Sequence, residues 1–237
     1  MEEKLKKVMK EIIYRAVKLG RRKKRTIYIS KTPGGEKIPV EELNPATIDG
    51  RKRLEEYLGK GRLYSIVSNL GSSSEKNRIN WRVVNLPLLQ RVIYLLLTFF
   101  CMLMKGCELK NRFYRAMGVQ IGRNVEIMQF SWLDHFRPEL ISISDNTLLG
   151  AFTKLTVHAY EGDGMFRVGY IQIGKNCKIA SGAAMGFIRI EDDVRVLPNT
   201  TLSPYFTYLK SGSVVGFDPP AKKTPLESRE MQNPDLH

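Results

Sequence analysis

Imidazole side chains are the groups in this sequence of 237 residues that can exchange a proton near neutral pH. The three histidines are His135, His158 and His237, the last of them in a polar tail. His158 lies in the run Leu-Thr-Val-His-Ala-Tyr, and His135 directly follows Asp134. Because an imidazole can take a proton from a hydroxyl or an amine, we expect His158 to be a general base. The alternative is a corner histidine whose ring hydrogen-bonds to the backbone.

The cysteines point away from disulfide and zinc chemistry. Cys101, Cys107 and Cys177 are odd in number, and no Cys-x-x-Cys pair occurs. We therefore expect buried thiols in a reducing cytosol and no metal site. The first residues lack the apolar segment of a secretory signal, which agrees with a cytoplasmic protein.

The net charge of +14 is concentrated in one half of the chain. Residues 1–110 hold 24 Lys and Arg against 11 Asp and Glu, a balance of +13, whereas the remainder is nearly neutral. The length suits one or two domains with a proper core, and a hydrophobic content of 43% excludes a fully disordered chain. An anionic partner is expected for the basic half, either a membrane surface, a phosphorylated ligand or nucleic acid.

The basic half is predicted to be an α-containing N-terminal region over residues 1–85. Apolar residues at steps of three and four predict an amphipathic helix over residues 3–19, with Gly20 as its end. A basic amphipathic helix of this kind suits an anionic membrane surface, a partner groove or RNA, and the alternative is a solvated helix that packs on its own domain. A short strand near residues 26–30 and a helix over 45–58 are expected in a mixed segment that reaches residue 80.

A second apolar segment covers residues 86–104 and opens a connector that runs to residue 118. Its uninterrupted apolar part begins at Val92 and is too short for a membrane span, which needs about 20 residues. A helix lying in a membrane interface or against another subunit is expected instead. Arg82, Arg91, Lys105 and Lys110 flank it and suit anionic headgroups.

From residue 119 the sequence repeats with a period of six. Large apolar residues recur at this spacing in four sets: Ile121, Ile127, Leu133; Ile143, Leu149, Leu155; Ile173, Ile179, Met185; and Ile190, Val196, Leu202. This period fits neither an amphipathic helix nor a single strand, and it is typical of a solenoid of short strands, a β-helix. Asn and Asp recur at the expected corners, where they tolerate the left-handed backbone region. Extra residues over 161–172 predict a loop ejected from one corner, directly after His158.

The repeat resembles the hexapeptide-repeat acyltransferases, the group that contains galactoside, maltose and serine acetyltransferases. The likeness covers roughly residues 110–222. The segment 214–223, Val-Val-Gly-Phe-Asp-Pro-Pro-Ala-Lys-Lys, is similar to the Val-Val-Gly-Gly-Asn-Pro-Ala-Lys ending of that family. The resemblance implies a mainly β protein with a left-handed parallel β-helix over residues 119–220. It also implies a homotrimer that binds acyl-CoA between subunits, with residues 221–237 as a polar tail.

The same resemblance suggests roles for individual residues. His158 precedes the ejected loop as the family's general base does, and Glu161 is a candidate to orient its ring. Asp134 and His135 are candidates to bind the acceptor, although Asp134 could instead cap a corner. The candidate cofactor-binding residues are Gly182, Ala183, Lys222 and Lys223. The two small residues have an equally good alternative explanation, since a tight corner demands them.

The leading hypothesis is an acetyl-CoA-dependent O-acetyltransferase acting on a sugar or a cell-envelope glycan precursor. It would be cytoplasmic and peripheral at the inner face of the membrane. One alternative is a catalytically inactive trimeric scaffold whose basic region binds an anionic membrane or nucleic acid. Nucleic acid binding has the least support, because no recognisable binding motif accompanies the charge. A γ-class carbonic anhydrase is excluded, since neither His135 nor His158 has a second histidine five residues away.

Overall fold

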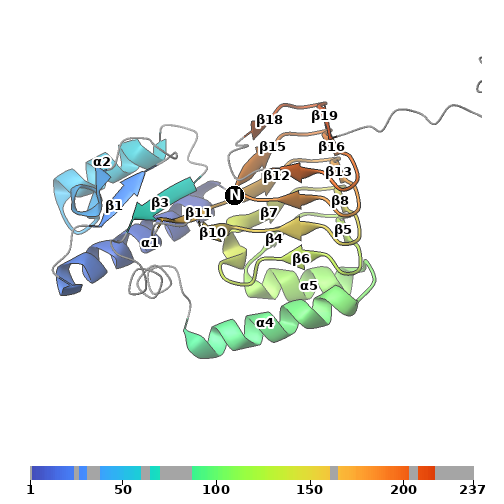
Figure 1. Cartoon of the computed structure of the whole chain (residues 1–237), viewed down its shortest axis with the longest axis horizontal. Coiled ribbons are helices and arrows are strands. Elements are labelled where there is room, and N and C mark those ends of the chain that lie inside the picture. Colours follow the sequence, from blue (N-terminus) through green and yellow to red (C-terminus); the bar gives the residue numbers. More distant parts are fainter. Residues whose placement is uncertain are drawn as a thin grey trace, which may run out of the picture.

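The computed structural model describes residues 2–23, 27–30, 38–59, 65–69, 87–160, 165–202 and 208–216. The helices are α1 (Glu2–Lys23), η1 (Val40–Leu43), α2 (Ile48–Gly59), α4 (Leu88–Leu103), α5 (Glu108–Met117) and η2 (Pro138–Leu140). The strands outside the solenoid are β1 (Tyr28–Ser30), β2 (Ile38–Pro39), β3 (Ser65–Asn69), β10 (His158–Tyr160) and β11 (Met165–Gly169). The remaining strands are short and form a stack, the solenoid, beside these elements (Figure 1).

The solenoid consists of three parallel sheets, each built from one short strand per coil. The first sheet contains β4 (Gln120–Ile121), β7 (Ile141–Ile143), β12 (Ile171–Ile173), β15 (Ile188–Ile190) and β18 (Tyr208–Leu209). The second contains β5 (Glu126–Ile127), β8 (Leu148–Leu149), β13 (Lys178–Ile179), β16 (Arg195–Val196) and β19 (Val214–Val215). The third contains β6 (Trp132–Leu133), β9 (Lys154–Leu155), β14 (Ala184–Met185) and β17 (Thr201–Leu202). Three parallel sheets of repeated two- and three-residue strands are typical of a left-handed parallel β-helix, so the predicted fold class is confirmed.

Residues at equivalent positions of the repeat pair with one another in successive coils. In the second sheet Ile127 pairs with Leu149, Leu149 with Ile179, and Ile179 with Val196. All four are buried, as are the equivalent residues of the third sheet. Beyond the last of the four sets, β18 and β19 pair with β15 and β16 and add a further coil within the predicted range of residues 119–220.

The first corner of each coil adopts the predicted backbone conformation. Asn124, Asn146, Asn176 and Asp193 have φ between 52° and 60°, in the left-handed region. Their side chains also form a ladder, in which each amide group hydrogen-bonds to the Asn or Asp of the next coil. The corner residues therefore contribute both the turn and a contact between successive coils.

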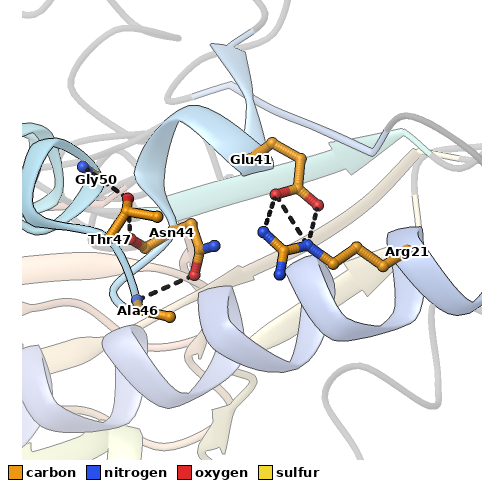
Figure 2. Close-up of polar contacts among 6 residues, drawn as sticks. All are labelled: Arg21, Glu41, Asn44, Ala46, Thr47 and Gly50. Atoms are coloured by element: carbon orange, nitrogen blue, oxygen red, sulfur yellow. Dashed lines mark hydrogen bonds and ion pairs between the residues drawn. The ribbon is translucent and has the colours of Figure 1, made fainter.

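The N-terminal helix packs on its own chain. Val8, Met9, Ile12 and Ile13 are buried, so the apolar face of α1 packs on its own chain and is not offered to a membrane. Gly20 does not end the helix, which continues to Lys23. The cost of an interior glycine is only about 1 kcal/mol, and Arg21 in the following turn is held by a bidentate ion pair with Glu41 (Figure 2).

The helix predicted over residues 45–58 is α2, and its first residue is set by a side-chain cap. The hydroxyl of Thr47 accepts the N–H of Gly50 at 3.1 Å, which satisfies a backbone donor in the first turn (Figure 2). Asn44 prepares this cap, since its side-chain oxygen accepts the N–H of Ala46 at 3.0 Å.

One end of the solenoid is closed by α4 and α5 (Figure 1). The α5 side chains reach the open edge of the first coil, where Asn111 donates to the carbonyl of Val125 and Arg115 donates to the carbonyls of Ile121 and Gly122. The segment predicted over residues 86–104 is thus helical. No helix in the described part of the chain has the length and apolar character needed to cross a membrane.

Candidate active site

The third sheet brings Asp134 and His158 together from adjacent coils. Leu133 at the end of β6 pairs with Leu155 at the end of β9, and the N–H of Asp134 donates to the Leu155 carbonyl at 3.0 Å. Asp134 therefore lies directly below the point where the next coil leaves the solenoid at His158. The residue spacing of 24 in sequence becomes a side-chain contact because the parallel register stacks one coil on the other.

Asp134 and His158 form a hydrogen-bonded dyad. Nδ1 of His158 lies 2.6 Å from Oδ2 of Asp134. The same oxygen accepts the N–H of Val157 at 2.9 Å, and Oδ1 accepts the N–H of Phe136 at 2.9 Å. The Asp134 side chain is only 1% exposed, whereas that of His158 is 21% exposed. Because backbone donors occupy both of its oxygens, the carboxylate acts as an acceptor, and the matching tautomer of His158 has its proton on Nδ1 and the lone pair on Nε2.

This geometry corrects the expectation that Asp134 binds the acceptor. A carboxylate that is buried and occupied by three donors cannot also reach a substrate in solvent. Asp134 instead orients the His158 ring, the role that the sequence suggested for Glu161. Glu161 itself lies outside the described residues, so its predicted role is not tested.

His135 lies in a row of aromatic rings beside the dyad. Its ring centroid is 5.3 Å from that of Trp132 and 4.6 Å from that of Phe136, and Phe136 in turn packs edge-on against His158 at 4.6 Å. Burial lowers the pKa of His135 below its ordinary value, with the neighbouring Asp134 acting in the opposite direction. Nδ1 of His135 is buried and has no hydrogen-bond partner among the described residues. Within that part of the chain, no group of three His, Cys, Asp or Glu side chains is placed to hold a metal ion.

The structure gives a separate outcome for each of the predicted cofactor-binding residues. Ala183 is fully buried inside the solenoid, so its side chain cannot line a surface path for pantetheine, and that prediction is wrong. Gly182 lies at a second-corner position with φ of 74°, and a Cβ there would lie 2.1 Å from Oδ1 of Asn199. The corner alone therefore explains the glycine. Lys222 and Lys223 lie outside the described residues.

The segment ejected after His158 is a β-hairpin that belongs to a larger sheet. His158 begins β10, which pairs antiparallel with β11 in the register His158 to Val168. The N–H of Gly169 donates to the Val157 carbonyl at 3.0 Å and closes the base of the hairpin. The next strand is β3, followed by β1 and β2, so the N-terminal region extends the sheet that carries His158 (Figure 1). The region of the expected loop thus contains strand β11, which joins the sheet of the basic region to the strand that begins at His158.

Comparison with known proteins gives one distant likeness to report. No protein-family model matches the sequence, and no curated protein matches it. Among solved structures, a maltose O-acetyltransferase from Clostridium difficile 630 is similar. Its sequence identity is 18%, its TM-score is 0.40, and the match covers 54% of this chain and 81% of that one. The strand registers described above establish the solenoid.

Two features of the site were not expected from the sequence. Phe136, which packs against the imidazole, was not singled out, although it lies two residues after Asp134. The pairing of β11 with β3 was also missed. The hexad register did contain a signal for the dyad: aligning Leu133 with Leu155 places Asp134 beneath Thr156, two residues from His158.

Proposed function

We propose that the protein is an acyltransferase that moves an acyl group, in the simplest case acetyl from acetyl-CoA, to a hydroxyl of a sugar or glycan precursor. The observation that carries the proposal is the dyad: a partly exposed imidazole has its Nδ1 2.6 Å from an oxygen of a buried carboxylate. A histidine required only as a corner residue has no need of a carboxylate that is itself fixed by two backbone donors.

The reaction follows from this arrangement. Nε2 of His158 accepts the proton of the acceptor hydroxyl as its oxygen attacks the thioester carbonyl carbon. Asp134 stabilises the imidazolium that forms. Collapse of the tetrahedral intermediate breaks the carbon–sulfur bond, and the imidazolium returns its proton to the leaving thiolate. The products are the ester and free CoA, and His158 regains its starting state.

Further roles in binding the acceptor and the cofactor are proposed for groups outside the dyad. His135 is proposed to contact the acceptor, since its half-buried ring lies next to Phe136, which packs against His158. Backbone amides along the coils are proposed to polarise the thioester carbonyl, and Lys222 and Lys223 to meet the cofactor phosphates. A homotrimer with the acyl-CoA between subunits completes this proposal.

The test measures acceptor-dependent release of CoA thiol from acetyl-CoA across panels of free sugars and sugar nucleotides. We expect His158→Ala to lower turnover by about 10²–10⁴-fold, the usual contribution of a general base. His237→Ala is the matched control and should leave turnover unchanged, and circular dichroism checks that both variants fold. Turnover of His158→Ala close to wild type would refute the assignment of the base. Absence of any heat on titration with acetyl-CoA would favour the inactive scaffold.

A further inference from the structure

One face of α4 consists entirely of apolar side chains exposed to solvent. They follow the helical period along the whole length of the helix, and each is between 45% and 73% exposed: Leu88, Leu89, Val92, Ile93, Leu96, Phe99, Phe100 and Leu103. The opposite face, with Thr98 and Cys101, is buried toward the solenoid. A continuous exposed apolar stripe of this kind marks an interaction site, because it is unfavourable in water.

Two phenylalanines extend this face at the end of the helix. The N–H of Phe130 donates to the carbonyl of Met102 in the last turn of α4 at 2.7 Å, and the ring of Phe130 stacks on Phe152 with centroids 5.0 Å apart. Both rings are exposed to solvent. We call the eight exposed α4 residues together with Phe130 and Phe152 the apolar surface.

The backbone at these two phenylalanines is strained, which sets them apart from other exposed apolar residues. Phe130 and Phe152 have φ of 59° and 60°, a region that bulky residues rarely adopt. The same corner in the next two coils is occupied by Gly182 and Asn199, which suit it better. Two large exposed rings in an unfavourable conformation indicate that this surface contacts something outside the chain.

The charges around the apolar surface select its partner. Helix α4 contains no acidic residue, exposed Lys105 lies two residues beyond its C-terminal end, and exposed Arg112 lies on the following helix, α5. Of the acidic residues near this end, Glu108 is paired with Arg115 at 2.5 Å, and Glu126 lies against Gly106. A second copy of the chain would bring the same cations face to face, whereas an anionic bilayer would attract them.

We propose that the apolar surface docks the protein on an anionic lipid bilayer, with α4 lying in the interface plane. The helix has 16 residues and is therefore about 24 Å long, shorter than the hydrocarbon core it would have to cross. A helix with an apolar face and a cationic border binds a bilayer by burying that face at the level of the headgroups. Contacts between rings run from Phe99 through Trp132 to His135, so the docked surface adjoins the site.

The full-length protein is tested by co-sedimentation with phosphatidylcholine vesicles, with and without phosphatidylglycerol. We expect binding to the anionic vesicles that weakens with salt, and much weaker binding to the neutral ones. Leu89→Gln/Leu96→Gln/Leu103→Gln removes apolar area without changing charge and should weaken vesicle binding by at least about tenfold. Ile48→Gln is the matched control, because Ile48 on α2 is 80% exposed but lies outside the apolar surface.

Two results would overturn the proposal. One is a triple variant that folds, as judged by circular dichroism, and binds anionic vesicles as tightly as wild type. The other is a triple variant that loses self-association in sedimentation velocity while vesicle binding is unchanged, because the apolar surface would then be covered by a second copy. Neither result depends on acyl transfer, so the docking proposal and the proposed function can fail separately.

Discussion

Replacing Asp134 by Asn tests how the dyad works, because the Asn side chain can adopt two orientations in which its NH₂ and its oxygen exchange places. If its NH₂ faces His158, the N–H of Val157 loses its acceptor and the imidazole must accept at Nδ1, which moves the ring proton to Nε2. If its NH₂ faces Phe136 instead, only the N–H of Phe136 loses its acceptor. Each arrangement leaves one backbone N–H without an acceptor, and the Val157 N–H is the more deeply buried of the two.

The structure therefore predicts which orientation of the Asn side chain is preferred and how much the free energy of unfolding falls. An unsatisfied buried donor costs about 1–3 kcal/mol, so the amide should turn its NH₂ toward Phe136 and keep the working tautomer of His158. Stability falls by about this amount. The imidazolium then loses a charged acceptor and keeps a neutral one, a difference of about 1–2 kcal/mol, which lowers turnover by about 5- to 30-fold. This loss is smaller than the one expected for His158→Ala.

The assay combines turnover with the tautomer itself. CoA-thiol release gives the rate, and long-range proton–nitrogen correlation spectra report which nitrogen of His158 carries the proton. Asp192→Asn is the control, since Asp192 also accepts a backbone N–H, that of Lys175 at 2.7 Å, but at a corner between the first and second sheets. A spectrum of Asp134→Asn with the proton on Nε2, together with a loss as large as that of His158→Ala, would refute the reasoning.

Three further predictions concern the solenoid and its cap. Phe152→Asn should raise the free energy of unfolding by about 1 kcal/mol, because Asn tolerates the left-handed backbone region at this position. The same variant should bind vesicles more weakly. Urea unfolding measures the stability and co-sedimentation measures the binding, and a loss of stability would contradict the strain argument. Gly182→Ala should lower the free energy of unfolding by more than about 1 kcal/mol, because the new Cβ would meet the side chain of Asn199. In an Asn199→Gly background the same substitution should cost less. Strictly additive effects of the two substitutions in urea unfolding would contradict this contact. Burial lowers the pKa of Lys110 from 10.5 to about 8, so between pH 8 and 9 the unfolded chain binds more protons and the free energy of unfolding should rise with pH, by at most about 1.4 kcal/mol per unit. Above pH 9 the rise should be offset, because burial raises the pKa of Cys101 from 9.0 to about 11; Lys110→Met should abolish the rise, and an unchanged slope in that variant would assign it to another group.

Much of the solenoid could be predicted from the sequence alone because its pattern is local. Each coil repeats the same alternation of an apolar strand residue and a tight corner, so Ile127, Leu149 and Ile179 could be aligned without knowing any long-range contact. The corner asparagines are equally local, since their preference for the left-handed region depends on their own side chains. His158 was found in the same way, from its place before an interruption of the repeat.

The tertiary structure alone decided which groups meet at the site and which faces remain open. Whether Asp134 turns toward a substrate or toward His158 depends on where the backbone donors of Phe136 and Val157 lie. The pairing of β11 with β3 joins segments about one hundred residues apart, and no local preference selects a strand partner at that distance. The apolar face of α1 is covered by its own chain whereas that of α4 is open, although both helices show the same apolar period. Sequence determines periodicity and turns because these arise from neighbouring residues, while partners across the fold are chosen by the packing of the whole chain.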